Sequence, residues 1–259
     1  MENEQIRLSE TIQKLAVQLL ATSPAGEGLC LIGGFRYRLL DASCRRSLDL
    51  DYSWPGDLEA KQGEVVALFR KKLLPLIRER MGYDGNVNPA TGPDADSAAV
   101  KTVEVAVWRT GGPLDRVTIP VDITWIPCAD KPIVRTVDGV VYLSASDADM
   151  VESKVLAIFL RPRLEERDMV DVFLFQDKIK PDAPERVRKK LSQLSMSKDR
   201  VSEMLKKTTT DRNYHVRNIR GIIRDQVDGQ AAANLEKAGG AAMIFDQVME
   251  LLGSRLRLL

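Results

Sequence analysis

The spacing of apolar residues changes about halfway along this chain of 259 residues. Alternating or fully apolar runs in the first half predict β-strands at residues 29–32, 48–52, 100–109, 117–126 and 133–143. Apolar residues at helical spacing predict helices at residues 12–20, 35–40 and 57–81. Residues 82–98 are rich in Gly, Pro, Asn and Asp, which predicts a loop. The first half is therefore expected to contain a mixed sheet with helices packed on it.

The second half has a helical period almost throughout. Helices are predicted over residues 146–160, from 167 onward, and at 185–194, 200–207, 218–227 and 242–252. Ser9 is the predicted N-cap of the first helix of the chain, and Ser146 or Asp147 that of the helix at 146–160. Pro75 and Pro162 are predicted to bend or end their helices. We expect an α+β protein with an N-terminal mixed-sheet lobe over residues 1–145 and a C-terminal all-helical lobe over residues 146–259.

The first candidate for chemistry is a glycine pair followed by two aspartates. The apolar run Leu31-Ile32 ends in Gly33-Gly34, and Asp49-Leu50-Asp51 follows. Side chains alternate along a strand, so the two aspartates share one face, while Leu48, Leu50 and Tyr52 take the apolar face. Neighbouring carboxylates repel each other unless a cation lies between them. The pattern indicates a divalent metal site beside a turn that admits phosphate, although a glycine pair after a strand is equally typical of a plain turn.

Asp122 is a third candidate carboxylate. It lies between Val121 and Ile123 in the strand predicted at 117–126. A carboxylate in so apolar a strand is either paired with a cation or placed at a sheet edge, and we expect the cation. Nucleotidyl transfer uses two divalent ions, which Asp49 and Asp51 could bridge while Asp122 ligates one of them. Hard oxygen ligands of this kind suit Mg²⁺ or Mn²⁺.

Charge is distributed unevenly along the chain. The formal net charge is +1, which argues against a generic polyanion-binding protein. Residues 176–224, however, hold fourteen Lys or Arg against six Asp or Glu, and the remainder is acidic. This basic stretch predicts an RNA- or DNA-binding surface; solvated helix faces with alternating charge are the alternative. The candidate RNA-binding residues are Arg186, Arg188, Lys189, Lys190, Lys206, Lys207, Arg217 and Arg220.

The cysteines and the single histidine indicate the redox environment of the protein and the kinds of metal site to expect. Three cysteines without a CxxC spacing indicate a reducing, cytoplasmic environment. The first residues, MENEQIRLSE, predict no secretory signal, and no apolar run is long enough for a membrane span. A single histidine, His215, argues against histidine-clustered metal sites and is expected at the surface or in contact with RNA.

Three motifs in order give the chain a resemblance to a known family. They are Arg45-x-Ser47-x-Asp49-x-Asp51, then Lys154-x-x-Ala157-x-x-x-Arg161, and then Arg167-Asp168-x-x-Asp171. Together with the glycine pair they resemble the DNA polymerase β-type nucleotidyltransferases. More narrowly, they resemble the AbiEii/AbiGii toxin family, to which the MenT toxins are similar. The resemblance covers roughly residues 28–175.

The resemblance implies a fold, an activity and partners. The fold would be bilobed, with the nucleotide between a catalytic lobe at residues 1–145 and a helical lobe at 146–259 that completes the NTP site and holds the acceptor. Such proteins are toxins of toxin–antitoxin and phage-defence systems. They use Mg²⁺ and an NTP to add nucleotides to the acceptor end of tRNA, which blocks translation. A cognate antitoxin is the further partner that the resemblance implies.

The resemblance also implies residue roles. Gly33, Gly34, Arg45 and Ser47 would belong to the nucleotide site, and Asp49 and Asp51 would bind metal. Lys154 would hold the triphosphate with support from Arg161, and Asp171 or Asp168 would assist the nucleophile or orient Lys154. Two departures from the family pattern are Pro120, near Asp122, where a basic residue is common, and the linker at residues 162–166.

Other readings of these residues remain open at this stage. Lys154 alone could be an ordinary surface lysine, Arg167 and Asp171 could be a structural pair, and Ser47 is more typical of a hydrogen-bonding neighbour of the aspartates than of a nucleophile. For the whole protein, the alternatives are an NTP-binding module without transfer activity, or an enzyme that nucleotidylates a protein or a small molecule.

Overall fold

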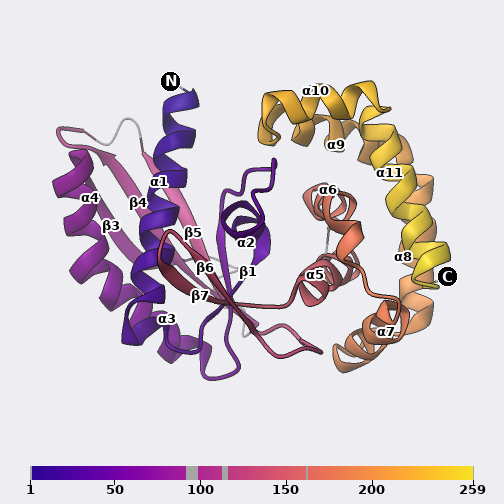
Figure 1. The fold of residues 1–259 in the computed structure, drawn as a ribbon, viewed down its shortest axis with the longest axis horizontal. Helices are drawn as coiled ribbons and strands as arrows, with labels where there is room; N and C mark the ends of the chain where they lie inside the picture. Colours follow the sequence, from indigo (N-terminus) through magenta and orange to yellow (C-terminus); the bar gives the residue numbers. More distant parts are fainter. Residues whose placement is uncertain (1, 92–98, 113–115, 162, 259) are drawn as a thin grey trace. The chain divides into compact units, whose positions relative to one another are not determined.

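The computed structural model describes residues 2–91, 99–112, 116–161 and 163–258. It divides into two compact units. The sheet unit comprises Met1–Ser43, Ser47–Ile126 and Pro132–Ser144, and the helical unit comprises Cys44–Arg46, Pro127–Lys131 and Ala145–Leu259. The predicted fold class is confirmed, with a mixed sheet in the N-terminal part and helices in the C-terminal part (Figure 1).

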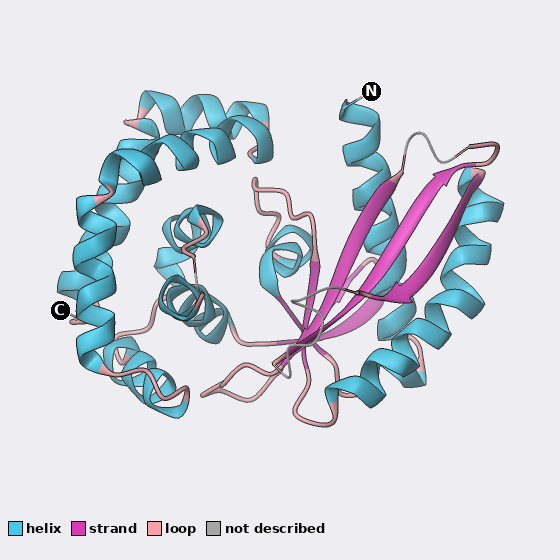
Figure 2. Ribbon diagram, turned by 180° about the vertical axis from the view of Figure 1, so that it is seen from behind, coloured by secondary structure: helices cyan, strands magenta, loops and turns pink. Residues whose placement is uncertain are grey.

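The described residues form a seven-stranded sheet in the order β3-β4-β5-β2-β1-β7-β6. Figure 2 shows its strands in magenta. Their bounds are Cys30–Ile32 (β1), Leu50–Ser53 (β2), Tyr83–Pro89 (β3), Val100–Arg109 (β4), Val117–Thr124 (β5), Ile133–Val137 (β6) and Val140–Ser144 (β7). β2 is parallel to β5 and β1 is parallel to β7, whereas all other neighbours are antiparallel. The predicted hairpin around Asp138-Gly139 is confirmed, and both residues have the positive φ that its tight turn requires.

Helices cover one face of this sheet and bury its apolar side chains. α1 (Glu2–Ala21), α3 (Leu58–Leu68) and α4 (Leu74–Met81) lie on that face (Figures 1 and 2). The core between them contains Ile12, Leu50, Tyr52, Val121 and Ile123. Because side chains alternate along strands, Asp51 and Asp122 point to the other face. The short helix α2 (Gly33–Leu40) begins directly after β1.

Two predicted helix features differ from the structure. Ser9 is no N-cap, because α1 already begins at Glu2 and the Ser9 hydroxyl donates back to the Gln5 carbonyl oxygen at 3.0 Å. The helix predicted at 57–81 does begin after the capping residue Asp57, but a π-helical turn at Phe69–Leu73 interrupts it. Pro75 follows that turn and cannot donate a helical hydrogen bond, which accounts for the local irregularity.

The strand β3 lies where a loop was predicted, so that prediction is wrong for residues 83–89; residues 92–98 lie outside the described residues. β3 is the outer strand of the sheet, where Pro and Gly are tolerated. Gly85 is required there, because a Cβ at this position would lie 2.6 Å from the Ala106 carbonyl oxygen. Leu48 is likewise not on the buried face: it is 58% exposed, since β2 begins only at Leu50.

The helical unit contains α5 (Asp147–Leu160), α6 (Glu166–Phe175), α7 (Ala183–Gln193), α8 (Lys198–Thr210), α9 (Arg212–Gln226), α10 (Gly229–Lys237) and α11 (Gly240–Glu250). Ser146 is the N-cap of α5, and its hydroxyl accepts from the Asp149 N–H. α10 was not predicted, and it buries no residue. Pro162, expected to end α5, lies outside the described residues. None of the described helices is long and apolar enough to cross a bilayer.

Candidate functional site

Gly33 lies where the first turn of α2 meets the carboxylate of Asp51. Its φ of +76° is strained for any residue with a side chain. A Cβ at Gly33 would lie 1.7 Å from Asp51 Oδ2, so the carboxylate occupies the space that a side chain would need. Sequence reasoning assigned Gly33 to phosphate contact; the structure shows that it also lets Asp51 approach the start of a helix, where unpaired N–H groups favour negative charge.

The three predicted metal-binding aspartates lie on or next to neighbouring strands. Asp51 on β2 and Asp122 on β5 are directly paired in register, and Asp49 immediately precedes β2. Since β5 lies between β4 and β2, Asp122 is not at a sheet edge. The Thr102 hydroxyl donates to Asp122 Oδ1 at 2.6 Å.

Asp49 is held by two polar neighbours. The Ser47 hydroxyl donates to Asp49 Oδ1 at 2.6 Å, the role expected of a hydrogen-bonding neighbour. The side-chain amide of the fully buried Gln13 donates to the Ser47 carbonyl oxygen at 3.1 Å and to the Asp49 carbonyl oxygen at 3.3 Å. Helix α1 thereby fixes the backbone that leads into β2.

The donor chemistry fits a divalent cation, but the protein does not supply a complete ligand set. Among the described residues, no three His, Cys, Asp or Glu side chains form a group that could hold a metal ion. Mg²⁺ commonly takes one or two carboxylates and completes its shell with water and substrate phosphate oxygens. Two in-register carboxylates and Asp49 therefore suit a nucleotide-bound Mg²⁺ or Mn²⁺ better than a resident structural metal, and their metal-binding role stays a prediction.

The second predicted motif places a buried lysine between two carboxylates within the helical unit. Lys154 on α5 is 8% exposed, and its Nζ lies 2.9 Å from Asp168 Oδ1 and 3.2 Å from Asp171 Oδ2, both on α6. Burial by itself would raise the pKa of Asp171, but the charges of Arg45 and Lys154 outweigh burial and hold that pKa below its usual value. Lys154 is thus no ordinary surface lysine.

Arg45 belongs to the helical unit although Ser43 and Ser47 belong to the sheet unit. Its guanidinium donates two hydrogen bonds to Asp171, from Nε at 2.5 Å and from Nη2 at 2.7 Å. Its backbone forms a bridge with Val227. Sequence reasoning placed Arg45 in the nucleotide site, whereas these contacts show a side chain directed at Asp171, in the paired geometry that makes Arg–carboxylate contacts strong.

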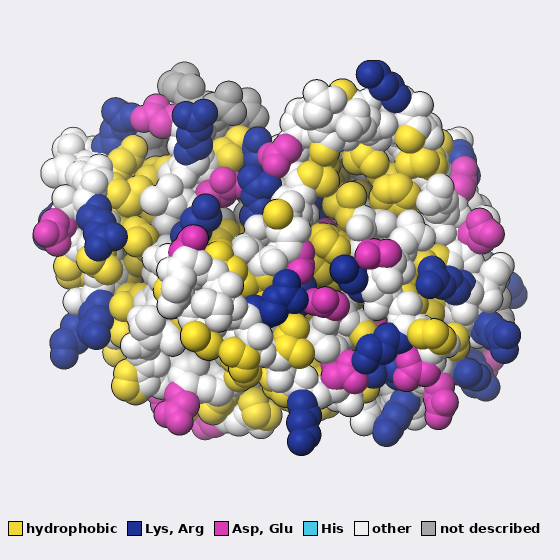
Figure 3. Space-filling view, in the orientation of Figure 1, with side chains coloured by type: hydrophobic (Ala, Val, Ile, Leu, Met, Phe, Trp, Pro, Cys, Tyr) yellow, Lys and Arg dark blue, Asp and Glu magenta, His cyan; other side chains and the backbone are white. Residues whose placement is uncertain are grey.

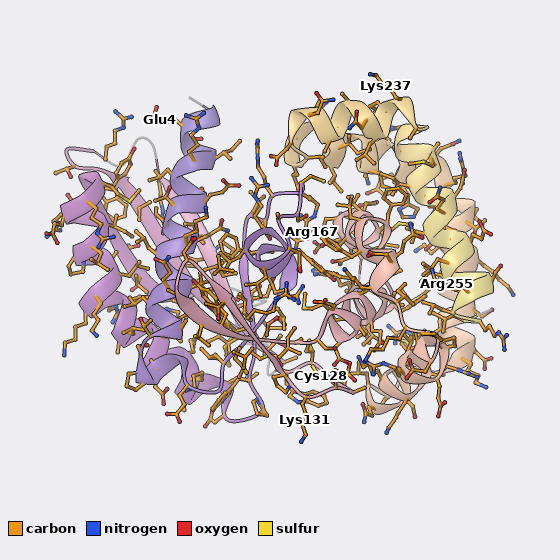
Figure 4. All side chains as sticks on the ribbon, viewed as in Figure 1. Glu4, Cys128, Lys131, Arg167, Lys237 and Arg255 are labelled. Atoms are coloured by element: carbon orange, nitrogen blue, oxygen red, sulfur yellow. The ribbon has the colours of Figure 1, made fainter. Side chains whose placement is uncertain are left out.

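Arg161 and the residues after it complete this cluster. Arg161 Nε lies 3.0 Å from Asp168 Oδ2, and Arg161 Nη1 donates to Glu165 Oε1 at 2.7 Å. Arg167, labelled in Figure 4, forms an ion pair of 2.6 Å with the same Glu165. We call Arg45, Lys154, Arg161, Arg167, Glu165, Asp168 and Asp171 the Lys154 cluster. It contains four cationic side chains and three carboxylates.

The structure contradicts the RNA-binding prediction for Arg186 and Lys190. Lys190 is 2% exposed, and its Nζ donates to Asp149 Oδ1 and Glu152 Oε2, each at 2.5 Å. Arg186 donates to Glu152 at 2.6 Å and to Asp130 at 2.9 Å. Both cations are therefore neutralised inside the fold by carboxylates that sequence reasoning did not single out, and they cannot grip phosphates from the surface.

We call Asp130, Asp149, Glu152, Lys180, Arg186 and Lys190 the Lys190 cluster. It joins α5 to α7 and to the segment Pro127–Lys131, on which Figure 4 labels Cys128 and Lys131. Burial would raise the pKa of Asp149, but Lys190 and the N–H groups of Ala129 and Asp130 lower it overall. Acidic residues on α5 and basic residues on α7 were visible in the sequence, but nothing there showed that these faces meet.

The other six predicted RNA-binding residues are exposed: Arg188, Lys189, Lys206, Lys207, Arg217 and Arg220. Lys and Arg side chains are spread over the visible face of the helical unit, on the right of Figure 3. His215 is not at the surface as expected: it is 7% exposed, its Nδ1 lies 2.9 Å from Glu166 Oε1, and its ring stacks on Phe245.

Comparisons with known proteins address the fold. The chain matches no protein-family model and shows no significant similarity to a curated protein sequence. Among solved structures, it is similar to JHP933 from Helicobacter pylori (19% identity, TM-score 0.55, covering 98% of this chain and 94% of that one). A second H. pylori protein, provisionally named a nucleotidyltransferase, has 18% identity, a TM-score of 0.56, and coverages of 98% and 97%.

A third similar structure is MenT4, the nucleotidyltransferase toxin Rv2826c from Mycobacterium tuberculosis H37Rv. It has 20% identity and a TM-score of 0.50, and the alignment covers 100% of this chain and 88% of MenT4. The similarity extends over both the sheet unit and the helical unit. The chain thus has the fold of the MenT4 nucleotidyltransferase.

Proposed function

We propose that this protein is a metal-dependent nucleotidyltransferase toxin. It would transfer the nucleoside monophosphate of an NTP to an RNA, with the 3′ end of tRNA as the preferred acceptor, release pyrophosphate, and so block translation. The fold shared with MenT4 supports the reaction class. The name of MenT4, a toxin, supports the biological role.

The observation that carries the proposal is the placement of Lys154. It is buried, and its ammonium is held between Asp168 and Asp171, while the part-exposed Arg161 lies against Asp168. A buried ion is unfavourable unless it is paired and fixed, so this lysine has a defined position. A fixed ammonium with a neighbouring guanidinium is suited to an anionic ligand such as a triphosphate.

Within this proposal, Lys154 binds triphosphate oxygens and Arg161 supports it. Asp171 is proposed to orient Lys154 rather than to accept a proton. Its lowered pKa keeps it ionised near neutral pH, and its oxygens already accept from Arg45 and lie near Lys154. Arg45 is then a positioning residue that acts through Asp171, and Asp168 has the same orienting role toward Lys154.

Asp49, Asp51 and Asp122 are proposed to hold Mg²⁺ or Mn²⁺. When bound, such an ion neutralises the charge that develops on the phosphate oxygens. The protein's part is to orient the carboxylates: Ser47 and Thr102 donate to Asp49 and Asp122. Gly33 leaves room for the carboxylate of Asp51, and Gly34 is proposed to offer backbone N–H to phosphate beside it.

The remaining parts of the proposal concern partners. The six exposed cations of the helical unit support an RNA acceptor, because phosphate contacts from Lys and Arg supply most non-specific affinity for nucleic acid. A toxin acting on tRNA would work in the cytoplasm and need a cognate antitoxin, and a role in phage defence would be consistent with that pairing.

The proposal is tested by incubating the purified chain with total RNA, Mg²⁺ or Mn²⁺, and each labelled NTP in turn. We expect label in RNA, reduced roughly 100- to 1,000-fold in Asp49→Asn and Asp51→Asn. Asp177→Asn removes the same charge from an exposed side chain (68%) and serves as the matched control. No incorporation into RNA, protein or small molecules with either metal would overturn the proposal. NTP binding without turnover would indicate a binding module, and label in protein would identify a different acceptor.

A further inference from the structure

The helical unit contains a pocket lined by residues that do not belong to the Lys154 cluster. Its volume is about 480 Å³, within the ~300–1,000 Å³ range of small-ligand sites. It is lined by the segment after α5, by the C-terminal part of α8 and by the start of α9. The lining residues are Arg163, Leu164, Met204, Lys207, Thr208, Asp211, Tyr214 and His215.

One wall of the pocket is aromatic and firmly supported. Tyr214 lines the pocket and is 48% exposed, so its ring is accessible to a ligand. His215 packs edge-on against it with ring centroids 5.4 Å apart. His215 is itself buried and fixed by Glu166, which also accepts from Asn218 at 2.8 Å. An exposed ring with a rigid backing is the arrangement on which unpaired bases stack.

The charges around this ring are available to a ligand. In the described part of the chain, Arg163 and Lys207 have no carboxylate within ion-pair distance, in contrast to Arg186 and Lys190. Asp211 adds one negative charge, so the three groups together carry +1 and favour an anionic ligand. The Asp211 carboxylate can accept from a ribose hydroxyl or a base amino group.

The pocket adjoins the Lys154 cluster along the chain. Arg163 and Leu164 lie between Arg161 and Glu165, which are both members of that cluster. Glu166, which fixes His215, is the first residue of α6, the helix that carries Asp168 and Asp171. A nucleotide seated against Tyr214 would therefore lie on α9, which packs against α6, the helix that carries Asp168 and Asp171.

We propose that this pocket binds one unstacked nucleotide of a single-stranded RNA, with the base on the Tyr214 ring and the phosphodiester between Arg163 and Lys207. The inference rests on the proposed function, because it assigns the pocket to the acceptor RNA. An inorganic anion would use the cations without the ring, and an uncharged apolar ligand would use the ring without the cations. A nucleotide uses both.

Binding is measured separately from transfer, by fluorescence anisotropy of a labelled single-stranded RNA of about ten nucleotides on the full chain. Tyr214→Leu keeps an apolar side chain but removes the ring, and we expect about 5- to 100-fold weaker binding. Tyr214→Phe should bind like wild type. Lys207→Met should lower the slope of log affinity against log salt by about 0.7, the value for one phosphate contact on a single strand. Lys237→Met, an exposed lysine on α10 outside the pocket, is the matched charge control.

The outcomes separate this inference from the proposed function. If wild type binds the RNA and Tyr214→Leu binds equally well, or if wild type does not bind it at all, the pocket inference is overturned. If wild type transfers nucleotides and Tyr214→Leu binds RNA as well as wild type, the proposed function is supported and the pocket inference is wrong. If RNA binding depends on Tyr214 but the chain transfers no nucleotide, the pocket inference is supported and the proposed function is wrong.

Discussion

Lys154 and Lys190 are two buried lysines of the helical unit, and each contacts two carboxylates. Their electrical surroundings differ. The Lys190 cluster holds three cations and three carboxylates, and its lysine side chain is 3% exposed. The Lys154 cluster holds four cations and three carboxylates, and its lysine side chain is 10% exposed.

This difference shows what separates a structural ion pair from a candidate ligand site. Burial and pairing are common to both lysines, so neither property alone indicates function. We propose that surroundings do. The Lys190 cluster is neutral by itself and gains further hydrogen bonds from the N–H groups of Ala129 and Asp130. The Lys154 cluster as defined above has one more cation than carboxylates and includes the part-exposed Arg161 and Arg167.

The largest expected effect is on stability, from Lys190→Met. The substitution keeps the volume but leaves Asp149 and Glu152 buried with one cation fewer, so the free energy of unfolding should fall by about 3–5 kcal/mol. Denaturant unfolding followed by circular dichroism measures the change. If the variant is as stable as wild type, the Lys190 cluster does not stabilise the fold.

Lys154→Met should reduce stability less than Lys190→Met does and should reduce nucleotide transfer strongly. Arg45 and Arg161 still compensate Asp171 and Asp168, so the loss of stability should be smaller, about 1–2 kcal/mol. Nucleotide transfer into RNA should fall about 100- to 1,000-fold, because the substitution removes the charge that we propose binds the triphosphate. The same unfolding and transfer assays on both variants decide the comparison: a stable, fully active Lys154→Met protein would remove the distinction between the clusters.

Acidification should weaken both clusters in the same direction. Asp149 and Asp171 both have lowered pKa values in the folded chain, below the unfolded value of about 3.9. The stability they contribute is complete above about pH 4 and is lost as the pH falls through the folded pKa values. The free energy of unfolding, measured at several pH values, should therefore fall less steeply below pH 4 for Asp149→Asn and Asp171→Asn than for wild type. Asp177→Asn is the control. Curves that stay parallel to wild type would contradict the lowered pKa values.

The smallest expected effect comes from Lys189→Met, one residue from Lys190. Lys189 is exposed and its substitution should change the free energy of unfolding by less than about 0.5 kcal/mol. Its effect should instead be confined to RNA affinity at low salt, measured by the anisotropy titration. A destabilisation as large as that of Lys190→Met would show that exposure does not distinguish the two neighbours.

Local signals predicted much of the fold. The alternation at residues 100–109 matches β4, and the Asp138-Gly139 turn was visible because its geometry depends on two adjacent residues. The strand β3 was missed because its Gly, Asn and Pro residues are tolerated only by virtue of its outer position in the sheet. That position is set by pairing with β4 and has no local signature.

The candidate site divides in the same way. Asp49 and Asp51 could be proposed as neighbours because strand alternation places both on one face. Asp122 was a separate candidate, and the register of β2 and β5 in the structure pairs it with Asp51. The partnership of Arg45 with Asp171 could not be predicted as a contact, because 126 residues separate them. Nor could the pairing of Lys190 with Asp149, which are 41 residues apart.

The sequence by itself determined where charge and apolar residues recur, and hence the fold class, the aspartate pair and the motif lysine. Tertiary structure alone decided which charges are neutralised. Electrostatic attraction and desolvation depend on distance and burial in space, so adjacent lysines such as Lys189 and Lys190 can differ completely. For the same reason, only the folded chain shows that Lys190 is held by Asp149 and Glu152 and that Lys154 is held by Asp168 and Asp171.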